Sequence, residues 1–234
     1  MIHLKDVTKI YSDNKVLALD EISLDIERGE FVFIVGTSGS GKSTLIRLLM
    51  HEEIATSGSI VVDGSDVTHL KPKEVPYLRR RLGVIFQDYR LLEDKTVYEN
   101  VAFAMQVIEA PRKIMQRSVN TVLDIVGLRE KSNSFPAQLS GGEQQRVAIA
   151  RAIVNDPHIV IADEPTGNLD PETSWDIMDI FQRINAAGTT IVMATHDKNI
   201  VDKMQRRVVE LVGGKIIRDE ARGTYDEYQP NRRL

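Results

Sequence analysis

A glycine-rich segment, GTSGSGKST at residues 36–44, constrains the fold of this chain more than any other feature. It follows the apolar run 31–35 and precedes the apolar run 45–50, so we expect a buried strand, a loop and a helix in that order. The segment fits G-x-x-x-x-G-K-[ST], in which glycines let backbone N–H groups converge on phosphates at a helix N-terminus. The alternative is a flexible Gly/Ser loop, but the flanking strand and helix favour a phosphate-binding loop.

We expect this loop to bind the phosphates of ATP. Lys42 should reach the β and γ phosphates and act in catalysis, and the Ser43 hydroxyl should ligate Mg²⁺. The candidate ATP-binding residues are Gly36, Thr37, Ser38, Gly39, Ser40, Gly41, Lys42, Ser43 and Thr44.

Three further short apolar runs, 82–86, 159–162 and 190–195, also read as strands buried on both faces, which is typical of a parallel sheet. Each is followed directly by polar residues, namely Gln87, Asp163 with Glu164, and His196. Ligands gather at the carboxyl ends of strands in an open α/β sheet, so these residues and the loop indicate a single site.

Each of these polar residues has a functional and a purely structural interpretation. Asp163 is expected to ligate Mg²⁺ and Glu164 to act as general base, although a solvated strand end would also explain the pair. His196 is expected to sense the nucleotide or stabilise the transition state, but a lone histidine is often structural. Gln87 could bridge metal and water as a catalytic residue, or simply cap its strand.

The segment LSGGEQQ at 139–145 predicts a helix start, because Ser140 and Glu143 form a capping box. A helix start is the bland interpretation. The two glycines, Gly141 and Gly142, also bare the backbone at this N-terminus and so predict a second anion site. Two anion sites suggest a ligand shared between two subunits.

The remaining segments predict additions to the parallel core. Residues 2–11 and 16–26 read as antiparallel strands, and 59–62 reads as a strand that enters a tight turn at Asp63-Gly64. The segment 91–145 is expected to contain a helical subdomain. The expected fold is therefore α/β, a P-loop NTPase (RecA-like) core with a mainly parallel sheet, an antiparallel β flank and a helical subdomain.

The expected organisation is one ATP-binding domain over residues 1–226 and a C-terminal tail, 227–234. The whole polar stretch 222–234 lacks periodicity and is expected to be loose. A formal charge of −4 gives no overall basic field, so nucleic acid is not an expected partner. The chain has no cysteine and no apolar run long enough to cross a bilayer, so we expect a cytoplasmic protein.

Together GTSGSGKST, Gln87, LSGGEQQ, IVIADE, NLD at 168–170 and His196 resemble the ABC ATPase family over about residues 1–220. The resemblance implies that two copies sandwich two ATP molecules head to tail. It also implies that the signature residues contact the partner's ATP, that Asp170 communicates between sites, and that Tyr11 stacks on adenine. Tyr11 could equally be an ordinary strand aromatic. The implied signature contacts are Ser140, Gly141, Gly142 and Glu143.

More narrowly, FVFIVGTSGSGKST, DEPTGNLD and the stretch 77–105 resemble the FtsE subfamily of bacterial cell-division ATPases. That resemblance implies a homodimer on the inner face of the cell membrane, which drives an integral membrane protein, FtsX, to control cell-wall hydrolysis. Alternatives are the ATPase of a lipoprotein-release or macrolide-type exporter and, further away, a nucleic-acid or ribosome-associated ABC ATPase. An ATP-binding module without hydrolysis would be expected to lack Glu164 or His196.

The resemblance also implies that the membrane partner docks in a groove beside Gln87, lined by residues 89–105. Tyr89, Leu91 and Leu92 are expected in a loop with exposed apolar groups, whereas Val101 and Phe103 are expected to pack inside the helical subdomain.

Overall fold

The structure is a computed structural model, and it describes residues 1–12 and 15–225. The chain forms two compact units. We call residues 1–70 with those from 192 onward the phosphate-loop unit, and residues 71–191 the signature unit. The boundary falls inside strand β8 (Thr190–Ala194).

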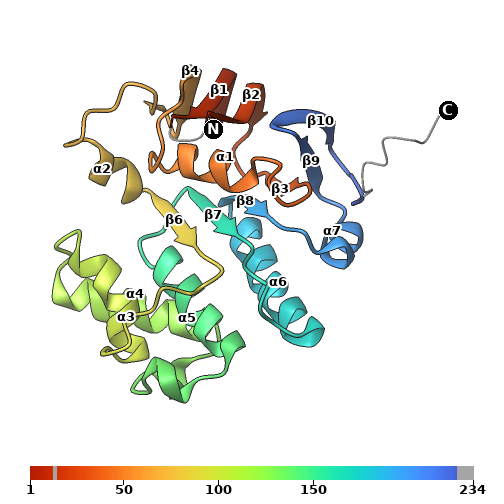
Figure 1. Cartoon of the computed structure of the whole chain (residues 1–234). Coiled ribbons are helices and arrows are strands. Elements are labelled where there is room, and N and C mark those ends of the chain that lie inside the picture. The colour runs from red at the N-terminus through yellow and green to blue at the C-terminus, as the bar shows by residue number, and fades with distance from the viewer. Residues whose placement is uncertain (13–14, 226–234) are drawn as a thin grey trace. The chain divides into compact units, whose positions relative to one another are not determined.

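An antiparallel sheet of order β2-β1-β4-β5 forms one part of the phosphate-loop unit (Figure 1). Its strands are β1 (Ile2–Tyr11), β2 (Val16–Ile26), β4 (Ser57–Val62) and β5 (Ser65–Asp66). Between β4 and β5, Asp63 and Gly64 have φ of 48° and 74°, as a two-residue hairpin turn with the twist of the strands requires. The predicted antiparallel flank and its tight turn are confirmed.

The same unit places β3 (Phe31–Val35) parallel to β9 (Arg207–Val212), which pairs with β10 (Lys215–Glu220) in antiparallel fashion. All five residues of β3 are buried, in agreement with the predicted buried strand. Helix α1 (Lys42–Leu49) follows β3 through the glycine-rich loop, and α7 (Lys198–Met204) follows β8. These connections place the glycine-rich loop and His196 at carboxyl ends of strands.

The signature unit combines two parallel strands with helices. Strand β6 pairs with β7 from Leu82 opposite Ile159 to Ile85 opposite Ala162. Helix α5 packs against α3, α4, α6 and β6. The elements are α2 (Val75–Arg79), β6 (Leu82–Ile85), α3 (Val97–Gln106), α4 (Arg112–Ile125), α5 (Gly141–Ile153), β7 (Ile159–Asp163) and α6 (Pro171–Ala186), with 3₁₀ turns at Arg129–Lys131 and Pro136–Gln138. The mixed α/β fold is confirmed, while the bounds of the domain and its subdomain stay predictions.

Residues 91–96 form a loop, in agreement with the loop expected at Leu91 and Leu92, and α3 begins at Val97 behind a capping box of Thr96 and Glu99. Two details differ from the expectations. Tyr89, Leu91 and Leu92 are half-buried rather than exposed. Tyr225 is buried, with its N–H donated to Asp202 Oδ1, so the loose stretch expected from 222 is wrong at its start. The predicted tail, 227–234, lies outside the described residues. None of the helices in 1–12 and 15–225 has the length and hydropathy to cross a membrane.

Asn100 ties the loop 91–96 to α3. Its side chain is fully buried, and its Oδ1 accepts the Leu92 N–H at 2.8 Å. Its Nδ2 lies 3.0 to 3.1 Å from the carbonyl oxygens of Leu92, Lys95 and Thr96. We predict that Asn100→Ala lowers the free energy of unfolding by about 2–4 kcal/mol, because several buried backbone groups lose their partner. Urea unfolding would measure this, with the exposed Asn133→Ala as control. Equal midpoints for the two variants would contradict the prediction.

Candidate functional site

The glycine-rich loop follows its path because two of its residues approach neighbouring backbone too closely for any side chain. A Cβ at Gly36 would lie 2.2 Å from the Leu211 carbonyl oxygen, and one at Gly41 would lie 2.6 Å from that of Ala18. Both glycines have positive φ, 144° and 109°. The strands next to the loop therefore fix its course and require glycine at both positions.

Lys42 closes this loop. Its ammonium donates to the carbonyl oxygens of Gly36 at 2.7 Å and Thr37 at 3.1 Å, so the charge lies across the loop. Gly41, as N-cap of α1, brings no side chain to the first N–H groups of that helix. A positive charge beside the N-terminus of a helix favours the binding of an anion, and phosphate binding by these residues stays a prediction.

Tyr11 lies next to this loop, with its hydroxyl 3.4 Å from Thr44 Oγ1. Lys9 orients the ring, since its Nζ lies 4.9 Å from the ring centroid and also binds Glu53 at 2.7 Å and the Ile54 carbonyl at 2.9 Å. The structure thus brings Tyr11 to the loop. The contribution of Lys9 was not predicted, because one lysine in an alternating strand gives no signal.

His196 belongs to the same unit and emerges from a fixed turn. Thr195 donates its N–H to the Ile34 carbonyl at 3.2 Å, and its hydroxyl oxygen accepts the Asp197 N–H at 3.0 Å. Asp197 then caps α7 by accepting the Ile200 N–H at 3.1 Å. An exposed imidazole is thus held beside the end of β3, from which the phosphate loop begins.

In the signature unit, Gln87 pairs with Asn168 of the segment NLD. The Gln87 amide nitrogen lies 3.4 Å from Asn168 Oδ1, and the Asn168 amide donates to the Gln87 carbonyl at 3.3 Å. Glu164 has a φ of 51° and begins a turn, in which the Gly167 N–H donates a hydrogen bond to the Glu164 carbonyl oxygen at 3.1 Å. A Cβ at Gly167 would lie 3.1 Å from Gln87 Nε2. The turn that follows Asp163 and Glu164 therefore packs on Gln87.

The signature segment starts α5 as predicted. The Glu143 N–H donates to Ser140 Oγ at 3.3 Å, and the Ser140 N–H donates to the Glu143 carboxylate at 3.0 Å, which confirms the capping box. Lys131 also binds this carboxylate, and both contacts hold the pKa of Glu143 below its usual range. The Ser140 hydroxyl accepts here, so its proton remains available for donation to an anion.

The two signature glycines differ in their surroundings. Gly141 is exposed, and a Cβ there would lie 3.1 Å from the Tyr89 hydroxyl. Gly142 is buried, and a Cβ would lie 2.3 Å from Thr173 Cγ2, so its small size also serves the packing of α5 on α6. Asp170 caps α6 by accepting the Thr173 N–H at 2.9 Å, and its hydrogen bonds to Thr173 lower its pKa.

Two residues of α5 that sequence reasoning missed hold the neighbouring loops. The buried Gln145 donates to the Pro165 carbonyl at 2.6 Å, directly after Glu164. Arg151 donates to the carbonyls of Arg90 at 2.6 Å and Tyr89 at 2.8 Å, in the segment after Gln87. Nothing in the sequence distinguished these two side chains from other polar residues of an amphipathic helix.

The candidate residues thus fall into two groups. The phosphate-loop unit holds the glycine-rich loop, Tyr11 and His196, and the signature unit holds the others. Residues 19–167, more than half of the chain, match the family described as ABC transporter. The chain therefore belongs to the ABC transporter family. Within that family it is an ATPase that binds and hydrolyses ATP.

Relatives of this ABC protein are similar along their whole length. FtsE of Bacillus subtilis, a cell division ATP-binding protein, is 54% identical over 97% of this chain and 100% of its own. FtsE of Mycobacterium tuberculosis is 57% identical over 96% of this chain and 98% of its own. A solved dimeric ATP-binding cassette bound to ADP and Pi is 35% identical, covers 96% of this chain and 100% of its own, and has a TM-score of 0.86.

Gly36 and Gly39 form a matched pair for substitution, because both have positive φ but only Gly36 approaches neighbouring backbone. We predict that Gly36→Ala reduces ATP affinity at least ~10-fold and costs about 2 kcal/mol of stability, because its Cβ would overlap the Leu211 carbonyl. Gly39→Ala should cost about 1 kcal/mol, since it has a φ of 76° but open space around its Cβ. Titration with ATP and thermal unfolding would measure both, and equal effects would contradict the steric account.

Proposed function

We propose that this chain is the ATPase subunit of a bacterial cell-division complex. In this proposal it is a peripheral protein on the cytoplasmic face of the membrane, forms an ATP-dependent head-to-tail homodimer, and drives an integral membrane protein resembling FtsX to control cell-wall hydrolysis. The observation that carries it is the 54–57% identity to curated FtsE proteins over almost the entire chain. The preformed anion site formed by Gly36, Gly41 and Lys42 supports the nucleotide part.

Mg²⁺ is proposed to accompany ATP. Among residues 1–12 and 15–225 no three His, Asp or Glu side chains gather as a metal cluster. Mg²⁺ in nucleotide sites needs no such cluster, because phosphate oxygens and water supply most ligands. The proposed protein ligands are Ser43, Gln87 and Asp163, all of them oxygen donors.

The proposed roles follow from what each side chain can do. The Lys42 ammonium neutralises developing phosphate charge, and the Glu164 carboxylate accepts a proton from the attacking water. His196, on its fixed turn, donates a hydrogen bond to the reacting phosphate. Tyr11 stacks on adenine, and Ser140, Gly141, Gly142 and Glu143 bind the nucleotide of the second copy, with Asp170 beside them at the start of α6.

We predict that Glu164→Gln keeps MgATP affinity but slows hydrolysis at least ~100-fold, because an amide cannot accept the proton. Lys42→Ala should instead lose ATP binding itself. Phosphate release and ATP titration separate the two effects, and Glu172→Gln, an exposed carboxylate on α6, is the control. Normal turnover in Glu164→Gln would move the base to another residue.

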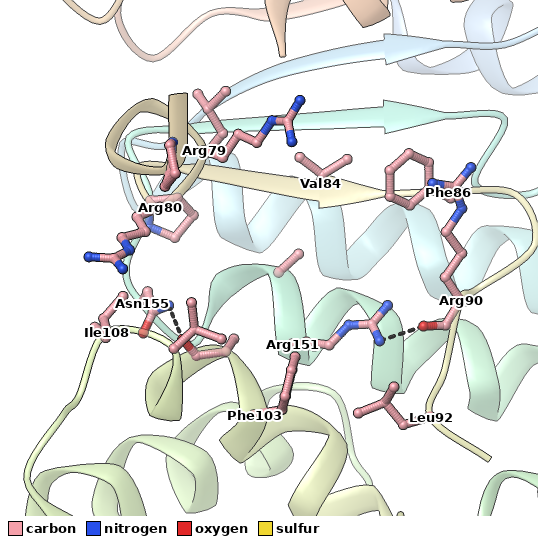
Figure 2. A pocket seen from close by; sticks show the side chains of 16 residues that line it. Arg79, Arg80, Val84, Phe86, Arg90, Leu92, Phe103, Ile108, Arg151 and Asn155 are labelled. Carbon is pink, nitrogen blue, oxygen red and sulfur yellow. Dashed lines mark hydrogen bonds between the residues drawn. The ribbon is translucent and has the colours of Figure 1, made fainter. Parts of the chain in front are cut away.

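A groove in the signature unit supports the docking of a membrane partner (Figure 2). It has a volume of about 580 Å³ and flanks Gln87, since Phe86 and Arg90 line it. Of the expected range 89–105, the structure places Arg90, Leu92, Phe103 and Ala104 at the groove but not Tyr89 or Leu91. Phe103 is 46% exposed there, so its expected packing inside the subdomain is wrong, whereas Val101 is buried as expected.

We predict that Leu92→Ser with Phe103→Ser weakens association with the membrane partner by about 2 kcal/mol, because both remove apolar anchors of the groove. The chain should stay folded and bind MgATP. Co-purification from detergent-solubilised membranes measures the loss, with Ile114→Ser as control, since Ile114 is 55% exposed outside the groove. Full yield of the partner with the double variant would refute the docking site.

A further inference from the structure

The docking groove carries charge of one sign. Its lining includes Arg79, Arg80, Arg90 and Arg151 and no aspartate or glutamate. The whole chain has a formal charge of −4, so this concentration of cations does not follow from composition. Figure 2 shows Arg79 and Arg80 toward the α2 side of the groove and Arg90 with Arg151 toward the other.

Arg151 is a partly buried cation of the groove whose hydrogen-bond partners are carbonyl groups. Its two terminal nitrogens donate to the carbonyls of Arg90 and Tyr89. Burial lowers its pKa, yet an arginine stays protonated at neutral pH. Among residues 1–12 and 15–225 no carboxylate forms an ion pair with it. Carbonyl dipoles solvate a charge without cancelling it, so the groove keeps a positive potential.

Two other guanidinium groups of the groove, those of Arg80 and Arg90, lie near aromatic rings. Arg90 stacks at 3.6 Å from the Phe86 ring centroid and binds Asp88 at 3.2 Å. Arg80 lies 5.3 Å from the Tyr77 ring centroid. Between these cations the groove offers apolar side chains that remain accessible, since Phe103, Val107 and Ile108 are 46%, 48% and 38% exposed.

The combination of apolar side chains and arginines in one groove favours one of two possible occupants, an amphipathic helix or anionic lipid. Anionic lipid headgroups bind basic residues at a membrane surface and need no groove for apolar side chains. An amphipathic helix uses both features, because its apolar residues fill the groove while its charged residues reach the rim. Guanidinium groups pair with carboxylates through two parallel hydrogen bonds, which selects carboxylate partners on such a helix.

We infer that the partner segment that occupies this groove is an acidic amphipathic helix, with its apolar face on Leu92, Phe103 and Val107 and its carboxylates on Arg80 and Arg90. This inference rests on the proposed docking function and adds the chemistry of the partner. The groove would then discriminate between partner segments by their charge as well as by their shape.

The test uses the full chain and two fluorescent synthetic helical peptides with the same leucine anchors, one with glutamates on its polar face and one with lysines. The glutamate peptide should bind at least ~10-fold more tightly at low salt, and added salt should reduce the difference. Arg80→Glu with Arg90→Glu should reverse the preference. Lys113→Glu, an exposed cation of α4 outside the groove, should leave it unchanged. Retained MgATP binding shows that the variants are folded.

Equal binding of both peptides, or a preference that survives the double reversal, would overturn the inference. So would binding of the chain alone to phosphatidylglycerol vesicles that depends on Arg80 and Arg90, because the cations would then serve lipid. The docking proposal fails separately. If the Leu92 and Phe103 variant loses the membrane partner while the arginine variant retains it, docking stands and the acidic helix is wrong.

Discussion

The close approach of the phosphate loop to the backbone beside it is the constraint on which the site depends. Gly36 passes the Leu211 carbonyl and Gly41 passes the Ala18 carbonyl at distances that no Cβ could share. This contact links the loop to β9 and β2, both of which pair within sheets of the same unit. The loop is therefore shaped before any nucleotide arrives, and its ammonium and helix N-terminus need little reorganisation to bind phosphate.

In the signature unit, side chains of a single helix, α5, hold the loops that contain the candidate site residues. Its capping box presents Ser140, its buried Gln145 holds the turn after Glu164, and its Arg151 holds the loop after Gln87. The Tyr89 hydroxyl lies next to Gly141, so the loop that leads to the groove also contacts the start of the signature. Packed and hydrogen-bonded groups thus connect the groove to the signature through the loop after Gln87 and α5.

Much of this arrangement was predictable because it follows from local rules. Fully apolar runs gave buried strands such as β3, Asp63-Gly64 gave a tight turn, and Ser140 with Glu143 gave a helix start. The exposure of Phe103 and the burial of Tyr225 were not predictable, because each depends on which distant surface the side chain meets. The same holds for Arg151, whose two carbonyl partners lie about sixty residues away in the sequence.

The proposed composite site holds each ATP between two copies of this chain, on the phosphate loop of one and the signature of the other. Sedimentation velocity of the Glu164→Gln chain with and without MgATP tests this arrangement, because slow hydrolysis preserves the nucleotide-bound state. We expect monomers without nucleotide, dimers with MgATP, and monomers that still bind ATP when Gly141→Asp is added, since that carboxylate would face the partner's phosphates. A chain that stays monomeric with saturating MgATP would rule out the composite site, as would one whose dimers are indifferent to Gly141→Asp.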